Sequence, residues 1–69
     1  MKNQAAEAYK RYAKARNKMK LNDYSVSKAA NVSTGTLSDW KSGRYMPKFD
    51  KISKIAEVVN TTVSEIYGA

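Results

Sequence analysis

The side chains of this chain that could do chemistry are amines, guanidinium groups, hydroxyls and a few carboxylates. Its 69 residues include 13 Lys and Arg, 6 Asp and Glu, and no His or Cys. Without these two residue types the chain lacks the commonest general base, the usual zinc ligands and the means to form disulfides. It also contains no glycine-rich phosphate loop and no clustered pair of acids. We therefore expect no enzyme, no metal and no cofactor, and we assign the polar side chains to binding.

The charge of the chain is strongly unbalanced, with a formal net charge of +7. Such a charge gives a positive potential that attracts nucleic acids or anionic membranes, and it does not choose between them. The bases are concentrated in the first twenty residues, where Glu7 is the single acid, while residues 55–69 hold Glu57 and Glu65 and no base. A solvated basic surface with no special purpose is the plain alternative.

Residues 22–43 form the segment that the other elements must position. They are predicted to form two short helices joined by a tight turn, because Asn22 and Ser33 can each cap a helix start with a side-chain oxygen. Asn31 lies where the chain must reverse, and Asn readily adopts positive φ. Ser27, four residues earlier, is small enough to let the two helices approach. This pattern indicates a helix-turn-helix.

The second of these helices separates into two faces when residues 33–42 are projected at 100° per residue. Leu37 and Trp40 fall on the inward side, where they favour core packing. The opposite side carries small or polar residues, namely Gly35, Ser38, Asp39 and Ser42. That outer face has no large apolar group, so it can approach another surface closely, as a DNA-reading helix does.

The chain resembles the helix-turn-helix family of phage repressors, Cro proteins and their bacterial relatives, often called XRE-type regulators. The resemblance covers most of the chain in three pieces, LNDYSVSKAANVSTGTLSDWKSG, then RYMPK, then a helix ending in VVNTTVSEIYG. It implies an all-α fold, a compact five-helix bundle like that of lambda repressor, in one domain over residues 1–69. It also implies a sequence-specific regulator of phage or bacterial type that binds double-stranded DNA, with repression as the expected mode.

Three positions depart from the common pattern of that family. Asp23 stands where a phosphate-contacting Gln is frequent, and Asn31 replaces the usual Gly. Lys41 replaces a frequent Glu, which in the common pattern is the acidic partner of an arginine on the first helix. That arginine is Arg16 here, and the resemblance implies that its usual partner is missing.

The resemblance also implies which residues meet DNA, with helix 34–42 in the major groove and the preceding helix across the backbone. The base-facing positions are Thr34, Gly35, Ser38 and Asp39. The phosphate-side positions are Asn22, Tyr24, Ser33, Arg44, Tyr45 and Lys48. Lys41 and Ser42 complete the expected DNA-binding set. Capping or plain solvation is the alternative role of each Ser and Thr, and a surface ion pair with a first-helix lysine or with Arg44 is the alternative role of Asp39.

Three further helices are predicted around the central segment. Residues 3–19 form a first helix, whose packing stripe is Ala8, Tyr12, Ala15 and Met19. Pro47 opens a fourth helix over residues 48–59, whose buried stripe is Phe49, Ile52, Ile55, Ala56 and Val59. Residues 62–65 form a capping box that begins a last short helix.

Partners other than DNA are also considered. A protein-binding module, for example an antitoxin-like domain whose basic face meets an acidic partner, would use the same fold. No apolar run approaches the length needed to span a bilayer, and the Ala-rich stripe of the first helix disfavours membrane binding, so we expect a cytoplasmic protein. Family resemblance implies a two-fold dimer on a palindromic operator. The surface around Val63, Ile66 and Tyr67 is the one left for pairing, so we expect a monomer or weak dimer in solution.

Overall fold

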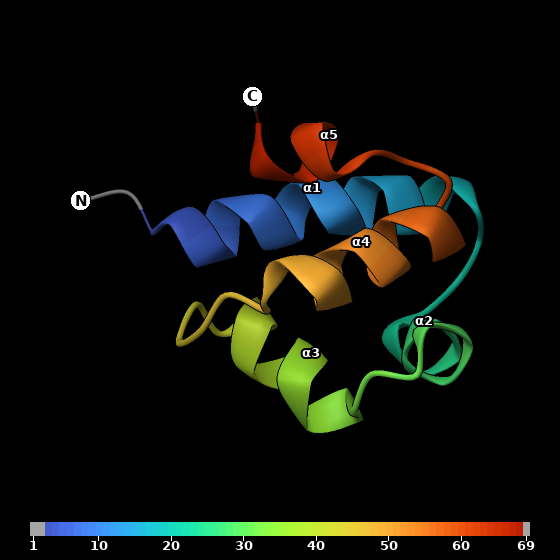
Figure 1. Cartoon of the computed structure of the whole chain (residues 1–69), viewed down its shortest axis with the longest axis horizontal. Helices are drawn as coiled ribbons and strands as arrows, with labels where there is room; N and C mark the ends of the chain where they lie inside the picture. The colour runs from blue at the N-terminus through green and yellow to red at the C-terminus, as the bar shows by residue number, and fades with distance from the viewer. Residues whose placement is uncertain (1–2, 69) are drawn as a thin grey trace.

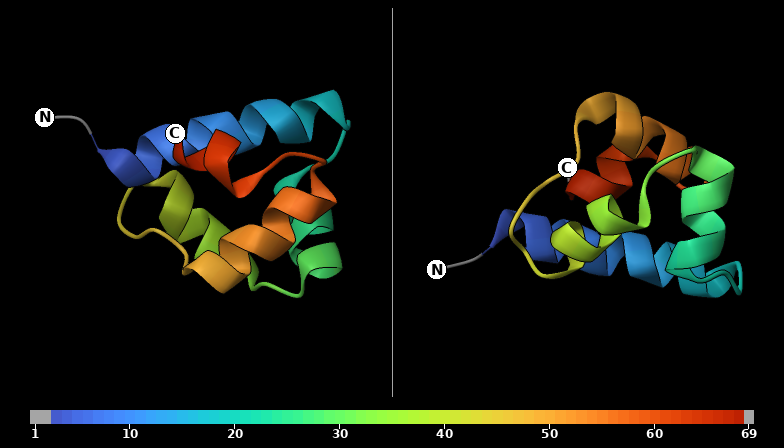
Figure 2. Two further views of the ribbon diagram at one scale, coloured as in Figure 1. Left: turned by 45° about the horizontal axis from the view of Figure 1, so that its top comes forward. Right: turned by 90° about the horizontal axis from the view of Figure 1, so that it is seen from below.

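The structure, a computed structural model, describes residues 3–68 and contains no strand in that range. Its five helices are α1 (Gln4–Lys18), α2 (Asp23–Ala30), α3 (Thr34–Lys41), α4 (Phe49–Val58) and α5 (Val63–Tyr67). In Figure 1 α5 lies above α1, while α2 and α3 lie below it. Two further views show the same five helices packed around one centre (Figure 2). The predicted all-α five-helix bundle is confirmed.

Four of the five helices begin at a side-chain cap. Asn3, Asn22, Ser33 and Thr62 each accept a hydrogen bond from the backbone N–H three residues later. These bonds satisfy first-turn donors that have no partner inside the helix. Lys48 precedes α4 without a side-chain cap. The short polar residues read from the sequence as caps therefore do set the boundaries of the central segment.

Each helix ends beside a residue with positive φ. These residues are Lys20, Asn31, Gly43, Asn60 and Gly68. After α3, the N–H of Gly43 donates to the carbonyl of Trp40 and the N–H of Arg44 donates to the carbonyl of Asp39, which is the Schellman arrangement. Asn31 has φ 56°, as its place between two helices predicted. The left-handed residues reverse the chain within a few positions and so keep all the connections short.

Replacing Asn31 by Ala is expected to destabilise the fold by about 1 kcal/mol, because an alanine is strained at positive φ. Asn31→Gly is the matched variant and is expected to leave the midpoint of urea unfolding within error of the parent or slightly above it. Equal stability of the Ala and Gly variants would show that the left-handed corner carries no strain.

The centre of the bundle is aromatic. Trp40 from α3 is fully buried, stacks on the ring of Tyr12 at 5.0 Å between ring centres and makes a T-shaped contact with the ring of Tyr9 at 5.5 Å. Leu37 is also buried on the same side of α3. Aliphatic side chains of α4, of its C-cap residue and of α5 add to the core, namely Ile52, Ile55, Ala56, Val59 and Ile66. The inward side of α3 is thus held rigidly against α1, as its projection predicted.

Three expectations about burial are wrong. Phe49 is 64% exposed because it is the first residue of α4, one turn before the helix meets the core at Ile52. Met19 is 44% exposed because it lies at the C-cap of α1, where the chain turns away. Ile66 is fully buried because it packs into the core, so it is not part of a pairing surface.

Candidate nucleic-acid interface

All twelve residues of the expected DNA-binding set are exposed. They come from three consecutive parts of the chain: the start of α2, the cap and helix of α3, and the loop of residues 44–48. α2 and α3 pack against each other and lie along the lower side of the molecule in Figure 1. The fold therefore brings these parts together and leaves their side chains open to a partner.

The outer face of α3 is small, polar and open. Leu37 is 1% and Trp40 is 0% exposed, whereas Gly35, Ser38 and Asp39 all face solvent. A Cβ placed on Gly35 would find only the Ser33 hydroxyl nearby, at 3.9 Å. Packing therefore does not require a glycine at position 35. The absence of a side chain there leaves the backbone of the first turn of α3 uncovered.

Local hydrogen bonds divide the polar residues of the expected DNA-binding set into two groups. The Asn22 amide oxygen accepts from the N–H of Ser25, the Ser33 hydroxyl accepts from the N–H of Thr36, and the Ser42 hydroxyl donates to the carbonyl of Asp39. These three side chains serve the helix ends. Within residues 3–68 the side chains of Thr34, Ser38 and Asp39 have no hydrogen bond and no ion pair.

The ion-pair alternative for Asp39 is not seen among the described residues. The ion pairs of residues 3–68 join Lys10 to Glu7 and Arg16 to Asp23. The carboxylate of Asp39 is therefore open to an external donor.

Lys28 is a basic residue of this region that the expected set omits. Its ammonium lies 5.4 Å from the centre of the Tyr24 ring, one helical turn earlier on α2. Such a contact orients a lysine while leaving its charge exposed. The four-residue spacing of Tyr24 and Lys28 on a predicted helix is the sequence signal that could have found it.

Asp23, the first residue of α2, is the centre of a hydrogen-bonded cluster with α1. The hydroxyls of Tyr9 and Tyr12 each donate to its carboxylate at 2.6 Å, and the guanidinium of Arg16 donates to it at 2.6 Å. Arg16 also donates to the Tyr9 hydroxyl at 3.1 Å. Arg16, whose usual partner is replaced by Lys41, therefore takes its carboxylate from Asp23 instead.

The protonation states of this cluster follow from burial and hydrogen bonding. Burial alone raises the pKa of Asp23, but the bonds from Tyr12, Tyr9 and Arg16 and the charge of Arg16 outweigh it, and the net pKa lies below the ordinary 3.8. Burial and the bond to Asp23 both raise the pKa of Tyr12 and of Tyr9. Burial disfavours the charged form of Arg16, yet its bonds to Asp23 and Tyr9 raise its pKa overall. At neutral pH the cluster therefore consists of the charged Arg16–Asp23 pair and the neutral hydroxyls of Tyr9 and Tyr12.

A second contact with α1 holds the other end of the helix-turn-helix. The Asn3 side chain accepts from the N–H of Ala6 and donates to the carbonyl of Gly43 at 2.9 Å. A Cβ on Gly43 would lie 2.6 Å from the Asn3 amide nitrogen, and its φ is +80°. The cap of α1 is thus also a clamp on the end of α3. Together with the Asp23 cluster, the bond from Asn3 to Gly43 ties both ends of the motif to α1. The spacing of residues in the sequence did not reveal this bond.

Within residues 3–68 no group of three or more carboxylate-bearing residues is placed to hold a metal ion. None of the helices in that part of the chain is long and apolar enough to cross a membrane.

Comparison with known proteins gives one positive result. A protein-family model described as Helix-turn-helix (HTH_3) matches residues 13–66. The matched range begins inside α1 and includes the whole of α2, α3 and α4, and so all twelve residues of the expected set. Neither the curated proteins nor the solved structures contain a match. The chain therefore belongs to the Helix-turn-helix family HTH_3, the XRE-type, Cro/C1-like regulators that bind double-stranded DNA.

Proposed function

We propose that this protein is a sequence-specific transcriptional regulator of phage or bacterial type, that it represses, and that it reads the major groove with α3. The observation that carries the proposal is the outer face of α3, where Thr34, Ser38 and Asp39 are exposed and have no internal partner in residues 3–68. An α-helix with its side chains is about 10–12 Å wide and fits a major groove of about 12 Å. Repression follows if the bound protein occludes a promoter in the cytoplasm.

The proposed contacts follow from the position of each residue around α3. Thr34 and Gly35 are in the first turn of the helix and would approach base edges most closely, with Ser38 and Asp39 one turn later. The residues of the 44–48 loop and of the α2 start would meet phosphates on either side. Arg44 and Lys48 supply charge in that loop, and both are exposed.

The test of this function is selection of bound sites from randomised DNA duplexes. A regulator of this kind is expected to enrich a short sequence in two related halves, separated by about one helical turn. Binding without any enriched sequence would reduce the protein to a nonspecific DNA binder, and absence of binding to duplex DNA would overturn the proposal.

Asp39→Asn is expected to remove a preference for cytosine at one position of each half-site. A carboxylate close to phosphates is repelled, whereas it can accept a hydrogen bond from the cytosine N4 amino group, which contributes about 1–3 kcal/mol against a wrong base. The measurement compares parent and variant on the selected site and on its single-base changes. Asp50→Asn removes an exposed carboxylate from α4 and is the matched control. Uniformly tighter binding by Asp39→Asn, with unchanged base preference, would show that Asp39 only repels.

We also propose that two copies bind one palindromic site although the free protein is a monomer or a weak dimer. Ile66 belongs to the core, which leaves Tyr67, 43% exposed, and the partly buried Val63 as the apolar surface of α5. So small a patch predicts weak self-association in solution. Sedimentation of the free protein and of its DNA complex measures both states. One protein per palindrome at saturation is the outcome that contradicts this prediction.

A further inference from the structure

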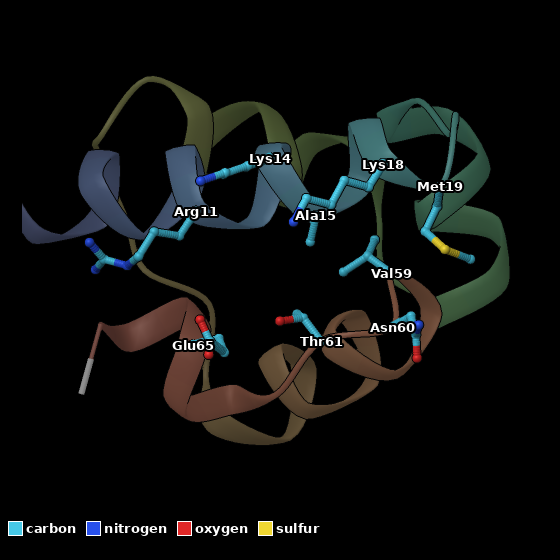
Figure 3. Close-up of a pocket in the computed structure, with 9 residues that line it drawn as sticks. All are labelled: Arg11, Lys14, Ala15, Lys18, Met19, Val59, Asn60, Thr61 and Glu65. Atoms are coloured by element: carbon cyan, nitrogen blue, oxygen red, sulfur yellow. The ribbon is translucent and has the colours of Figure 1, made fainter.

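A groove runs along the side of α1 that does not face α3. One wall is formed by α1, where Arg11, Lys14 and Lys18 follow one another at helical spacing. The other wall is formed by the end of α4 and the start of α5, from Val59 to Glu65. The hollow between them has a volume of about 330 Å³ and is shown in Figure 3.

The groove is separate from the proposed DNA interface. On α1, Tyr9 and Tyr12 pack against Trp40 of α3, and the groove residues fall on a different side of the same helix. In Figure 1 α5 lies above α1 and α3 lies below it. A partner in the groove could therefore be bound while α3 is in contact with DNA.

The charges of the groove are positive and mostly uncompensated. Arg11 is fixed, because its guanidinium donates to the carbonyls of Ile66 and Tyr67 at the end of α5. Lys14 and Lys18 are exposed, and the ion pairs found within residues 3–68 include neither of them. Three bases thus face a single acid of the lining, Glu65.

Some of the groove lining is apolar. Ala15 is partly exposed and the side chain of Met19 at one end is 44% exposed, whereas Val59 is buried. Methionine is flexible and adapts to different apolar partners. Exposed lysines beside exposed apolar groups favour a ligand that offers both carboxylates and an apolar side chain.

We propose that this groove is a docking site for an acidic, amphipathic peptide segment of another protein, with carboxylates on Lys14 and Lys18 and an apolar side chain against Ala15 and Met19. The hollow is at the small end of the range of ligand pockets and fits a few side chains. A DNA duplex does not enter a hollow of this size and gains nothing from the apolar groups of Ala15 and Met19. The inference goes beyond DNA binding, since it gives the regulator a second surface for a protein partner.

The experiment uses the full chain, labelled with nitrogen-15, and a short synthetic peptide designed as a helix. In this peptide Glu residues lie along one face of the helix and Leu residues along another. Adding the peptide is expected to shift the amide resonances of Ala15, Lys18, Thr61 and Glu65, and to leave those of Ser38 and Asp39 in place. Two control peptides separate the contributions: one has Ser in place of Leu, and the other has Gln in place of Glu. Both are expected to bind at least about fivefold more weakly, because each lacks one half of the recognition.

Charge reversal provides the matched variants. Lys14→Glu combined with Lys18→Glu is expected to weaken peptide binding about tenfold, because each change turns an attraction into a repulsion. Lys54→Glu, an exposed position on α4 outside the groove lining, is expected to change it less than twofold. A thermal unfolding curve of each variant confirms that it folds.

Four results would overturn the proposal: peptide shifts on α3, equal weakening by Lys54→Glu, equal binding of the Ser peptide, and concentration-dependent shifts of the groove amides without peptide. The last would make the groove a contact between copies of this chain. DNA binding is measured on the same variants. A parent protein that binds DNA but not the peptide is a failure of this inference alone. A parent protein that binds the peptide but not DNA is a failure of the proposed regulator.

Discussion

Asp23→Asn is expected to lower the free energy of unfolding by about 2 kcal/mol. The variant keeps the shape of the side chain and removes the charge that balances Arg16. Removing one partner of a fully buried ion pair costs about 3–5 kcal/mol, and we expect less here because the side chains of Arg16 and Asp23 are 17% and 28% exposed. In a chain of this size about 2 kcal/mol corresponds to a fall of roughly 8–16 °C in Tm. Thermal unfolding followed by circular dichroism measures it.

The control for Asp23→Asn is Glu57→Gln, which removes an exposed carboxylate from α4. It is expected to change Tm by no more than about 2 °C, since surface charges contribute little. Tyr12→Phe removes one donor from the same carboxylate and is expected to fall between the two. If Asp23→Asn and Glu57→Gln had equal Tm values, the cluster would contribute nothing to stability.

The stabilisation by Asp23 has a defined pH dependence. The pKa of Asp23 is lower in the folded protein than its ordinary value of 3.8. Its contribution is therefore fully present above that value, and it is lost as the pH falls through the folded pKa. The Tm difference between the parent and Asp23→Asn should be constant near neutral pH and shrink below about pH 4. A difference that persists unchanged to about pH 2 would show that the charge of Asp23 is not its source.

The second large effect concerns salt. Raising the salt from about 50 to about 200 mM is expected to weaken binding to the selected DNA site about 500-fold, if about five phosphates are neutralised and the slope of log K against log salt is near −4.5. The exposed bases of the proposed interface are Lys28, Lys41, Arg44 and Lys48. With the amides at the start of α2 they account for about that number of contacts.

Fluorescence anisotropy of a labelled duplex at several salt concentrations measures this slope. Arg44→Gln should reduce the slope by about 0.9, because one phosphate contact is lost. Lys54→Gln removes the same charge from α4, outside the proposed interface, and should leave the slope unchanged. A slope near zero for the parent protein would contradict binding through phosphates altogether.

The parts of this structure that the sequence predicted are those determined by neighbours along the chain. A cap such as Asn22 or Ser33 bonds to an amide three residues away, and Asn31 reverses the chain through its own φ angle. The two faces of α3 follow from helical period alone. Rules that involve only neighbouring residues are therefore enough to predict where the motif lies and which face of α3 is polar.

The parts that the sequence did not predict depend on how the helices meet. Periodicity assigned Phe49 to a buried stripe, but only the packing of α4 decides which turn first reaches the core. The bond from Asn3 to Gly43 joins residues 40 positions apart. The groove beside Lys14 and Lys18 exists only because α5 returns to α1. No single-helix pattern contains this information.

The pairing of Arg16 with Asp23 links two positions, 23 and 41, at which this chain departs from the family's common pattern. In that pattern an acid at position 41 balances the arginine, and position 23 contacts phosphate. Here Asp23 supplies the carboxylate that pairs with Arg16, and position 41 carries an exposed lysine. We therefore expect relatives that carry an acid at position 23 to lack one at position 41, and an alignment of the family would test this.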